Sequence, residues 1–135
     1  MFDIKCMEEK EVKNMNPQVL AFVGDGVYSL FVRHKLVLTS GLKGKDLHNL
    51  TTSYVKAGGQ SNSIGNILPL LNETEMSVFK RARNHKTLSQ SKNANIVDYR
   101  RATGFEAVLG YLYLIGDVER LNFLLHNCLG ENDEG

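Results

Sequence analysis

The sequence predicts an all-α fold of about six or seven helices, similar to a helical bundle. Apolar residues recur every three or four positions along most of the 135-residue chain, as they do on the buried face of a helix. Residues that favour helix caps precede several of these segments, and glycines follow them. No segment alternates between apolar and polar residues over the length that a half-buried strand requires. Short connections then favour antiparallel neighbours.

The first clear helix is expected over residues 17–38. Asn16 can cap it, and Pro17 suits its first position. Residues 24–26 (Gly-Asp-Gly) interrupt the apolar pattern, because Asp-Gly favours turns and each glycine inside a helix costs about 1 kcal/mol relative to alanine. Either the helix breaks there, or a close neighbour requires a bare backbone. Residues 1–13 lack periodicity, and we expect them to be weakly ordered or ordered only by docking.

Two further helices are expected before residue 71. Asp46 can cap the first of them, and the Gly58-Gly59 pair would end it. Its apolar face comes from Leu47, Leu50 and Tyr54. The second helix is expected over residues 61–70 and closes around Pro69.

The second half of the chain predicts three more helices. Residues 72–75 (Asn-Glu-Thr-Glu) have the spacing of a capping box and begin a helix that ends near Arg83. A polar loop follows, and Asn95 can cap a helix that Gly116 ends. Its apolar face comes from Val97, Phe105, Val108, Leu109, Leu112 and Ile115. Asp117 then caps a last helix that stops at Gly130, with Leu121, Leu124, Leu125 and Cys128 inward.

Length and composition indicate one cytoplasmic globular domain over residues 1–135. Apolar residues make up 42% and charged residues 23% of the chain, near the globular average. No apolar run is long enough to span a bilayer, and the charged start of the chain lacks the apolar core of a signal peptide. Cys6 and Cys128 form no CxxC pair, so we expect free thiols and no structural zinc.

Positive charge is concentrated between residues 80 and 101. Between Lys80 and Arg101, seven basic residues face a single acid, Asp98. Such a stretch suits contact with a phosphate backbone. A solvated helix and loop surface explains the charge equally well, so both interpretations stay open.

Asp25 and Glu106 are the candidate catalytic acids, because each stands in an otherwise apolar helix. A buried acid costs several kcal/mol unless it is paired or binds a cation. Small residues surround both of them at helical spacing: Ala21, Gly24, Gly26 and Ser29 for one, and Ala102, Thr103, Gly104 and Gly110 for the other. Small side chains allow close approach, so the acids could converge on Mg²⁺, which prefers one or two carboxylates. Surface acids at a solvent face or a kink are the alternative, and on residue types alone the commoner one.

Two segments resemble the ribonuclease III catalytic domain. LAFVGDGVYSLFVR is similar to the signature helix of that family, and TGFEAVLGYLYL is similar to its second acidic helix. The stretches GDxVYxxxVR (24–33), RxRN (81–84) and YRxxTxFEAxLGYLxL (99–114) resemble the Mini-ribonuclease III (Mini-III) subgroup, a catalytic domain without a double-stranded-RNA-binding domain. The resemblance covers about residues 17–125.

The resemblance implies a Mg²⁺-dependent endoribonuclease for double-stranded RNA, with Mn²⁺ able to substitute. Asp25 and Glu106 would be both the catalytic residues and the metal ligands. Full-length relatives carry further acids where this chain has Gln18, Ala21 and Thr103. The products would have 5′-phosphate and 3′-hydroxyl ends. The family also implies a homodimer, and the subgroup implies maturation of the large-subunit (23S) ribosomal RNA precursor with help from a ribosomal protein.

RNA contacts are expected at the end of the helix that ends near Arg83 and in the loop that follows it. The residues expected to bind RNA are Arg81, Arg83, Asn84, Lys86 and Lys92. Duplex RNA is recognised largely by its shape and backbone, and any sequence preference would come from the 84–95 loop. The rival interpretation is a non-catalytic RNA-binding dimer with the acids as structural pairs. An unrelated helical DNA-binding module is a third.

Overall fold

The computed structural model describes residues 2–41, 43–55, 57–85 and 96–129, and these residues form helices and connections without any strand. The helices are α1 (Glu9–Lys13), α2 (Pro17–Thr39), α3 (Gly44–Val55), α4 (Ala57–Ile67), the 3-10 helix η1 (Leu68–Leu70), α5 (Glu73–Asn84), α6 (Ile96–Ile115) and α7 (Val118–Cys128). The all-α prediction is therefore confirmed. No helix in this part of the chain is long and apolar enough to cross a membrane.

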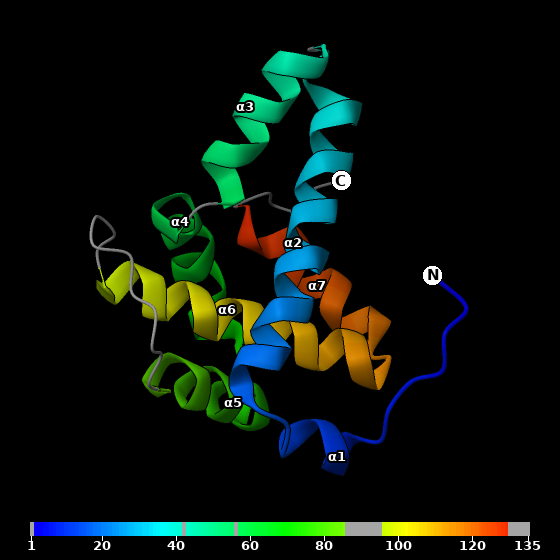
Figure 1. The fold of residues 1–135 in the computed structure, drawn as a ribbon, viewed down its shortest axis with the longest axis vertical. Coiled ribbons are helices and arrows are strands. Elements are labelled where there is room, and N and C mark those ends of the chain that lie inside the picture. Colours follow the sequence, from blue (N-terminus) through cyan, green and yellow to red (C-terminus); the bar gives the residue numbers. More distant parts are fainter. Residues whose placement is uncertain (1, 42, 56, 86–95, 130–135) are drawn as a thin grey trace.

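Helix α6 lies at the centre of the fold, where α1, α2, α4, α5 and α7 pack around it (Figure 1). Most of its middle is buried: Phe105, Ala107, Val108 and Leu109 have no exposed surface. The predicted buried face thus left out residues such as Ala107 that are buried. It was wrong for Val97, which is 59% exposed near the beginning of the helix. Periodicity shows one buried face, whereas a helix surrounded by neighbours has several.

Helix α2 runs through residues 24–26 without a break, so Gly24 is explained by a close neighbour and not by a helix end, whereas Gly26 has open space around it. A Cβ atom on Gly24 would lie 1.6 Å from the main-chain oxygen of Glu106, and one on Gly110 would lie 2.0 Å from that of Leu20. The backbones of α2 and α6 therefore touch at their crossing. Because this contact leaves no room for a side chain at either position, it fixes how the two helices align.

Several predicted helix ends are confirmed. The Asn16 side chain accepts a hydrogen bond from the Gln18 amide, and Asn72 and Glu75 form the capping box. Asp117 accepts from the Arg120 amide. Glu75 is buried, and its carboxylate also accepts two 2.7 Å hydrogen bonds from the Arg120 guanidinium, which joins α5 to α7. The expected cap at Asn95 and stop at Gly130 lie outside the described residues.

Two helix boundaries were predicted wrongly between α3 and α4. Helix α3 begins at Gly44, so Asp46 lies in its first turn and not at its cap. Gly58 and Gly59 do not end that helix, because both lie inside α4. Helix α4 buries Gln60, Ser63, Ile64 and Ile67. This packing outweighs the low helix propensity of glycine.

Residues 2–13 include the short helix α1, which the sequence pattern did not predict. The fully buried Val12 anchors α1 in the core, and the Met7 amide donates to the Leu114 carbonyl at 2.8 Å. The guanidinium of Arg81 donates to the main-chain oxygens of Lys13, the last residue of α1, and of Met15. A helix of five residues is too short for its periodicity to be recognised.

Candidate active site

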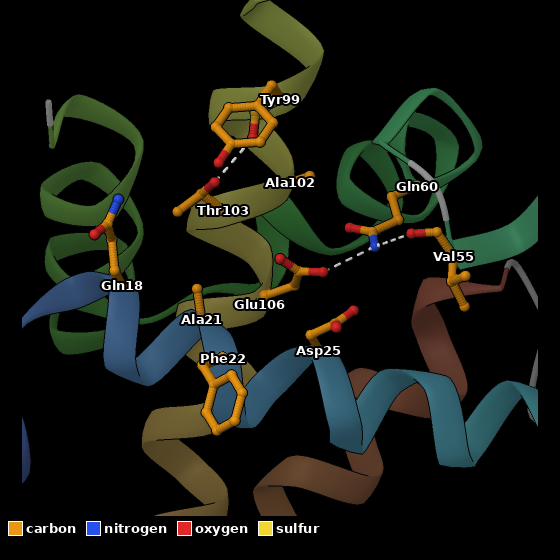
Figure 2. A pocket seen from close by; sticks show the side chains of 10 residues that line it. All are labelled: Gln18, Ala21, Phe22, Asp25, Val55, Gln60, Tyr99, Ala102, Thr103 and Glu106. Atoms are coloured by element: carbon orange, nitrogen blue, oxygen red, sulfur yellow. Dashed lines mark hydrogen bonds between the residues drawn. The ribbon is translucent and has the colours of Figure 1, made fainter. Parts of the chain in front are cut away.

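An open pocket of about 400 Å³ lies between α2, α4 and α6, beside the end of α3. Asp25 enters it from α2 and Glu106 from α6, and Figure 2 shows the two side chains pointing toward each other. The pocket also contains Gln60 of α4, together with two alanines whose short side chains keep it open. The predicted convergence of the two acids is therefore present in the structure.

The α2–α6 crossing places the two acids together. Gly24 touches the main chain of Glu106, so the residue after Gly24 stands beside the Glu106 side chain. A bulkier residue at either crossing glycine would separate the helices and, with them, the carboxylates. Two of the small neighbours noted in the sequence, Gly24 and Gly110, therefore allow the two backbones to touch.

The two acids differ in their surroundings. Asp25 is exposed, whereas Glu106 is half-buried. Burial raises the pKa of the Glu106 carboxyl to about 8, a hydrogen bond from Gln60 opposes this rise, and the nearby Asp25 adds to it. Like charges this close cannot both ionise cheaply without a cation between or beside them.

The residues of the pocket fit a hard divalent cation. Within the described residues, no lysine or arginine lines the pocket to neutralise the pair, and no group of three or more potential metal ligands occurs. Two carboxylates with room for water suit Mg²⁺, which keeps part of its hydration shell and takes one or two carboxylates from the protein. The site therefore offers the donor set of Mg²⁺ and lacks the nitrogen and sulfur ligands that zinc prefers.

Gln18, Ala21 and Thr103 all line the same pocket. These are the positions at which the resemblance expects further acids in full-length ribonucleases III. Thr103 donates its hydroxyl to the Tyr99 carbonyl, and Ala21 is buried. The pocket thus presents two carboxylates, with neutral residues at the other three positions.

The residues predicted to bind RNA have different surroundings. The guanidinium of Arg81 donates to the carbonyls of Lys13 and Met15, at and just after the end of α1. Arg83 lies over the Phe79 ring and donates its Nε to the Asn84 side chain at 3.2 Å. Lys86 and Lys92 lie outside the described residues.

Gln60 is a residue of the site that the sequence analysis missed. It is 1% exposed and donates to the Glu106 carboxylate at 3.1 Å. The Gly58-Gly59 pair suggested a helix end just before it, so it was not placed on a buried face. Its spacing of three, four and seven residues from Ser63, Ile64 and Ile67 was the available signal.

The fold and pocket define an all-helical domain with a pair of carboxylates at the crossing of its two longest described helices. Residues 18–117 match the family model described as the ribonuclease III domain. The chain belongs to the ribonuclease III family and, by its relatives, to the Mini-ribonuclease III group within it.

Two relatives and one solved structure illustrate this membership. The chain is 48% identical to Mini-ribonuclease 3 of Clostridium tetani over 122 residues, which covers 87% of this chain and 78% of that protein. It is 49% identical to Mini-ribonuclease 3 of Brevibacillus brevis over 106 residues, covering 78% and 79%. A crystal structure of a Fusobacterium nucleatum protein superposes with a TM-score of 0.75 at 28% identity and covers 89% of this chain and 96% of that one.

Proposed function

We propose that this endoribonuclease cleaves double-stranded RNA in a Mg²⁺-dependent reaction, with Asp25 and Glu106 as its catalytic carboxylates. One observation carries the proposal: two acids from separate helices meet in an open pocket of a ribonuclease III family domain. A purely structural pair would be expected to have a basic partner, and the described lining of the pocket contains none. This absence argues against the rival in which the acids only stabilise the fold.

Each residue of the site has a distinct task in this proposal. Asp25 and Glu106 would hold Mg²⁺, or Mn²⁺ in its place, directly or through water. When bound, the ion activates water and neutralises charge on the scissile phosphate. Gln60 donates to Glu106, and the alanines leave space at the bottom of the pocket for water and phosphate.

RNA contact is proposed at the end of α5 and in the loop after it. Arg83 and Asn84 stand at the end of that helix, where they can reach a phosphate backbone. Lys86 and Lys92 follow this helix in the sequence and would add positive charge. Arg81 adds a further positive charge one helical turn before Asn84. Such contacts read the shape of duplex RNA and its backbone.

The proposal includes a homodimer. Val19 and Phe22 are 45% and 78% exposed one helical turn apart on α2, and Phe22 borders the pocket. A second copy is the partner that would cover this apolar surface and place two sites on one duplex, one for each strand. From the Mini-III resemblance we also propose a cytoplasmic role in maturing the 23S ribosomal RNA precursor, helped by a large-subunit ribosomal protein.

Incubation with labelled duplexes tests the proposed function. We expect the protein to cut duplex RNA with Mg²⁺, to leave it intact in EDTA, and to leave duplex DNA intact under both conditions. The products should carry 5′-phosphates, which phosphatase treatment before end-labelling will reveal. Binding of intact RNA without cleavage would favour the non-catalytic rival, and a preference for DNA would favour the DNA-binding alternative.

The stability of the metal-free protein should depend on pH through Glu106. The pKa of its carboxyl is about 8 in the folded protein against an ordinary value of 4.5, so the folded state binds this proton more tightly. The stabilisation is complete below the ordinary pKa and is lost as the pH rises toward the folded value. We expect the Tm in EDTA to fall between about pH 5 and pH 8, and Mg²⁺ to offset the fall because it favours the ionised pair.

Calorimetry of Glu106→Gln supplies the control for this pH effect. The variant keeps a side chain of the same length but has no proton to lose, so its Tm should fall less steeply over the same range. The same steep slope in both proteins would show that Glu106 is not the source of the effect.

A further inference from the structure

Gln60 makes both of its donor contacts through one nitrogen. Its Nε2 donates to the main-chain oxygen of Val55 at 2.7 Å and to Oε2 of Glu106 at 3.1 Å (Figure 2). The first bond fixes the amide to the end of α3, and the second reaches the carboxylate. The amide of Gln60 therefore links three helices at the edge of the pocket.

The other half of the amide is left without a partner. Oε1 of Gln60 is buried and accepts no hydrogen bond from the described residues. A buried acceptor without a donor destabilises the folded state. Ser63, three residues along the same helix, is by contrast satisfied by the Tyr28 hydroxyl at 3.1 Å. An apolar side chain of the same length would avoid this cost, so a glutamine at position 60 is explained by its two donor bonds and not by its oxygen.

A neutral amide is suited to hold a metal-binding carboxylate. It donates a hydrogen bond that orients the ionised group, but it brings no positive charge that would compete with a cation for the two acids. A lysine or arginine in the same place would neutralise them. Partners that orient metal ligands in this way strongly affect metal affinity and activity.

We propose that Gln60 is a positioning residue, which holds the Glu106 carboxylate where it can bind the metal together with Asp25. The inference rests on the proposed function of those two acids. The hydrogen bonds to Val55 and Glu106 would then serve metal binding. We therefore expect substitutions of Gln60 to affect metal binding more than the stability of the fold.

The test replaces Gln60 with Met, which has a similar length but no N–H group and no orphaned oxygen. We expect Mn²⁺ affinity, followed by electron paramagnetic resonance, to fall about 10–100-fold and cleavage at limiting Mg²⁺ to fall by a similar factor. The Tm in EDTA should stay unchanged or rise, and duplex RNA binding without metal should stay unchanged. Gln60→Leu serves as a second apolar variant should Met pack poorly.

Ser63→Ala is the matched control, because it removes a buried polar contact from the same helix away from the pocket. It should lower the Tm and leave Mn²⁺ affinity unchanged. The inference is overturned if Gln60→Met keeps normal Mn²⁺ affinity and cleavage. It is also overturned if both apolar variants lose Mn²⁺ affinity and cleavage only together with a lower Tm. Absence of metal-dependent cleavage by the unmodified protein would overturn the proposed function, and this inference with it.

Discussion

Replacing Asp25 with Asn should lower the rate of duplex RNA cleavage at least about 1,000-fold, which corresponds to roughly 4 kcal/mol of transition-state stabilisation. Asp25 is exposed on α2 and lines the pocket opposite Glu106. Asparagine has nearly the same shape, but it removes one of the two charges that would hold the metal. The side chain is not part of the buried core, so the fold should tolerate the change.

Three measurements separate a catalytic effect from a structural one. Initial rates on labelled duplex RNA with saturating Mg²⁺ give the activity, gel shifts in EDTA give RNA binding, and thermal unfolding gives stability. The last two should stay close to those of the unmodified protein. Asp46→Asn is the matched control, because Asp46 is also exposed but lies in α3 outside the pocket. Normal cleavage by Asp25→Asn would rule out the proposed role of this acid.

Sequence patterns predicted the helices that are long and capped. Asn16, Asn72 and Asp117 mark helix beginnings by local chemistry, since each side chain satisfies amides within its own first turn. Such signals need no knowledge of the rest of the fold. The all-α class and most helix ends followed from them and from the spacing of apolar residues.

Features that depend on tertiary contacts could not be predicted in the same way. Gly58 and Gly59 lie inside α4, which begins at Ala57 and is held by its packing against the core. The contacts of Arg81 could not be predicted either, because its guanidinium bonds to carbonyls that lie 66 and 68 residues earlier in the chain. Local sequence contains no information about such partners, so a pattern of charge cannot tell a packing contact from a binding surface.

The candidate site shows the same division. Asp25 and Glu106 were recognisable because acids among small residues in apolar helices are unusual. Gln60 was not, because its importance arises only where α4 meets α6. Whether the helix continues through residues 24–26 also stayed open, because a close helix contact and a helix break both favour glycine. Only the crossing of α2 and α6 decides between them.

The second large effect is expected from Gly24→Ala, which should lower the free energy of unfolding by at least about 3 kcal/mol. The new Cβ would lie 1.6 Å from the main-chain oxygen of Glu106 and 2.9 Å from the amide nitrogen of Gly110. Both are backbone atoms of α6, so no side chain can rotate away to make room. The helices must separate, which opens the core around Leu20 and Leu109.

Urea denaturation followed by circular dichroism would measure this loss, and Gly26→Ala supplies the comparison. A Cβ on Gly26 meets nothing within 4 Å, so alanine there should stabilise the same helix by up to about 1 kcal/mol. Two identical substitutions, two residues apart, are thus expected to act in opposite directions. If both variants gained stability, the backbones of α2 and α6 could not be in contact, and the structural reason for the meeting of Asp25 and Glu106 would be lost.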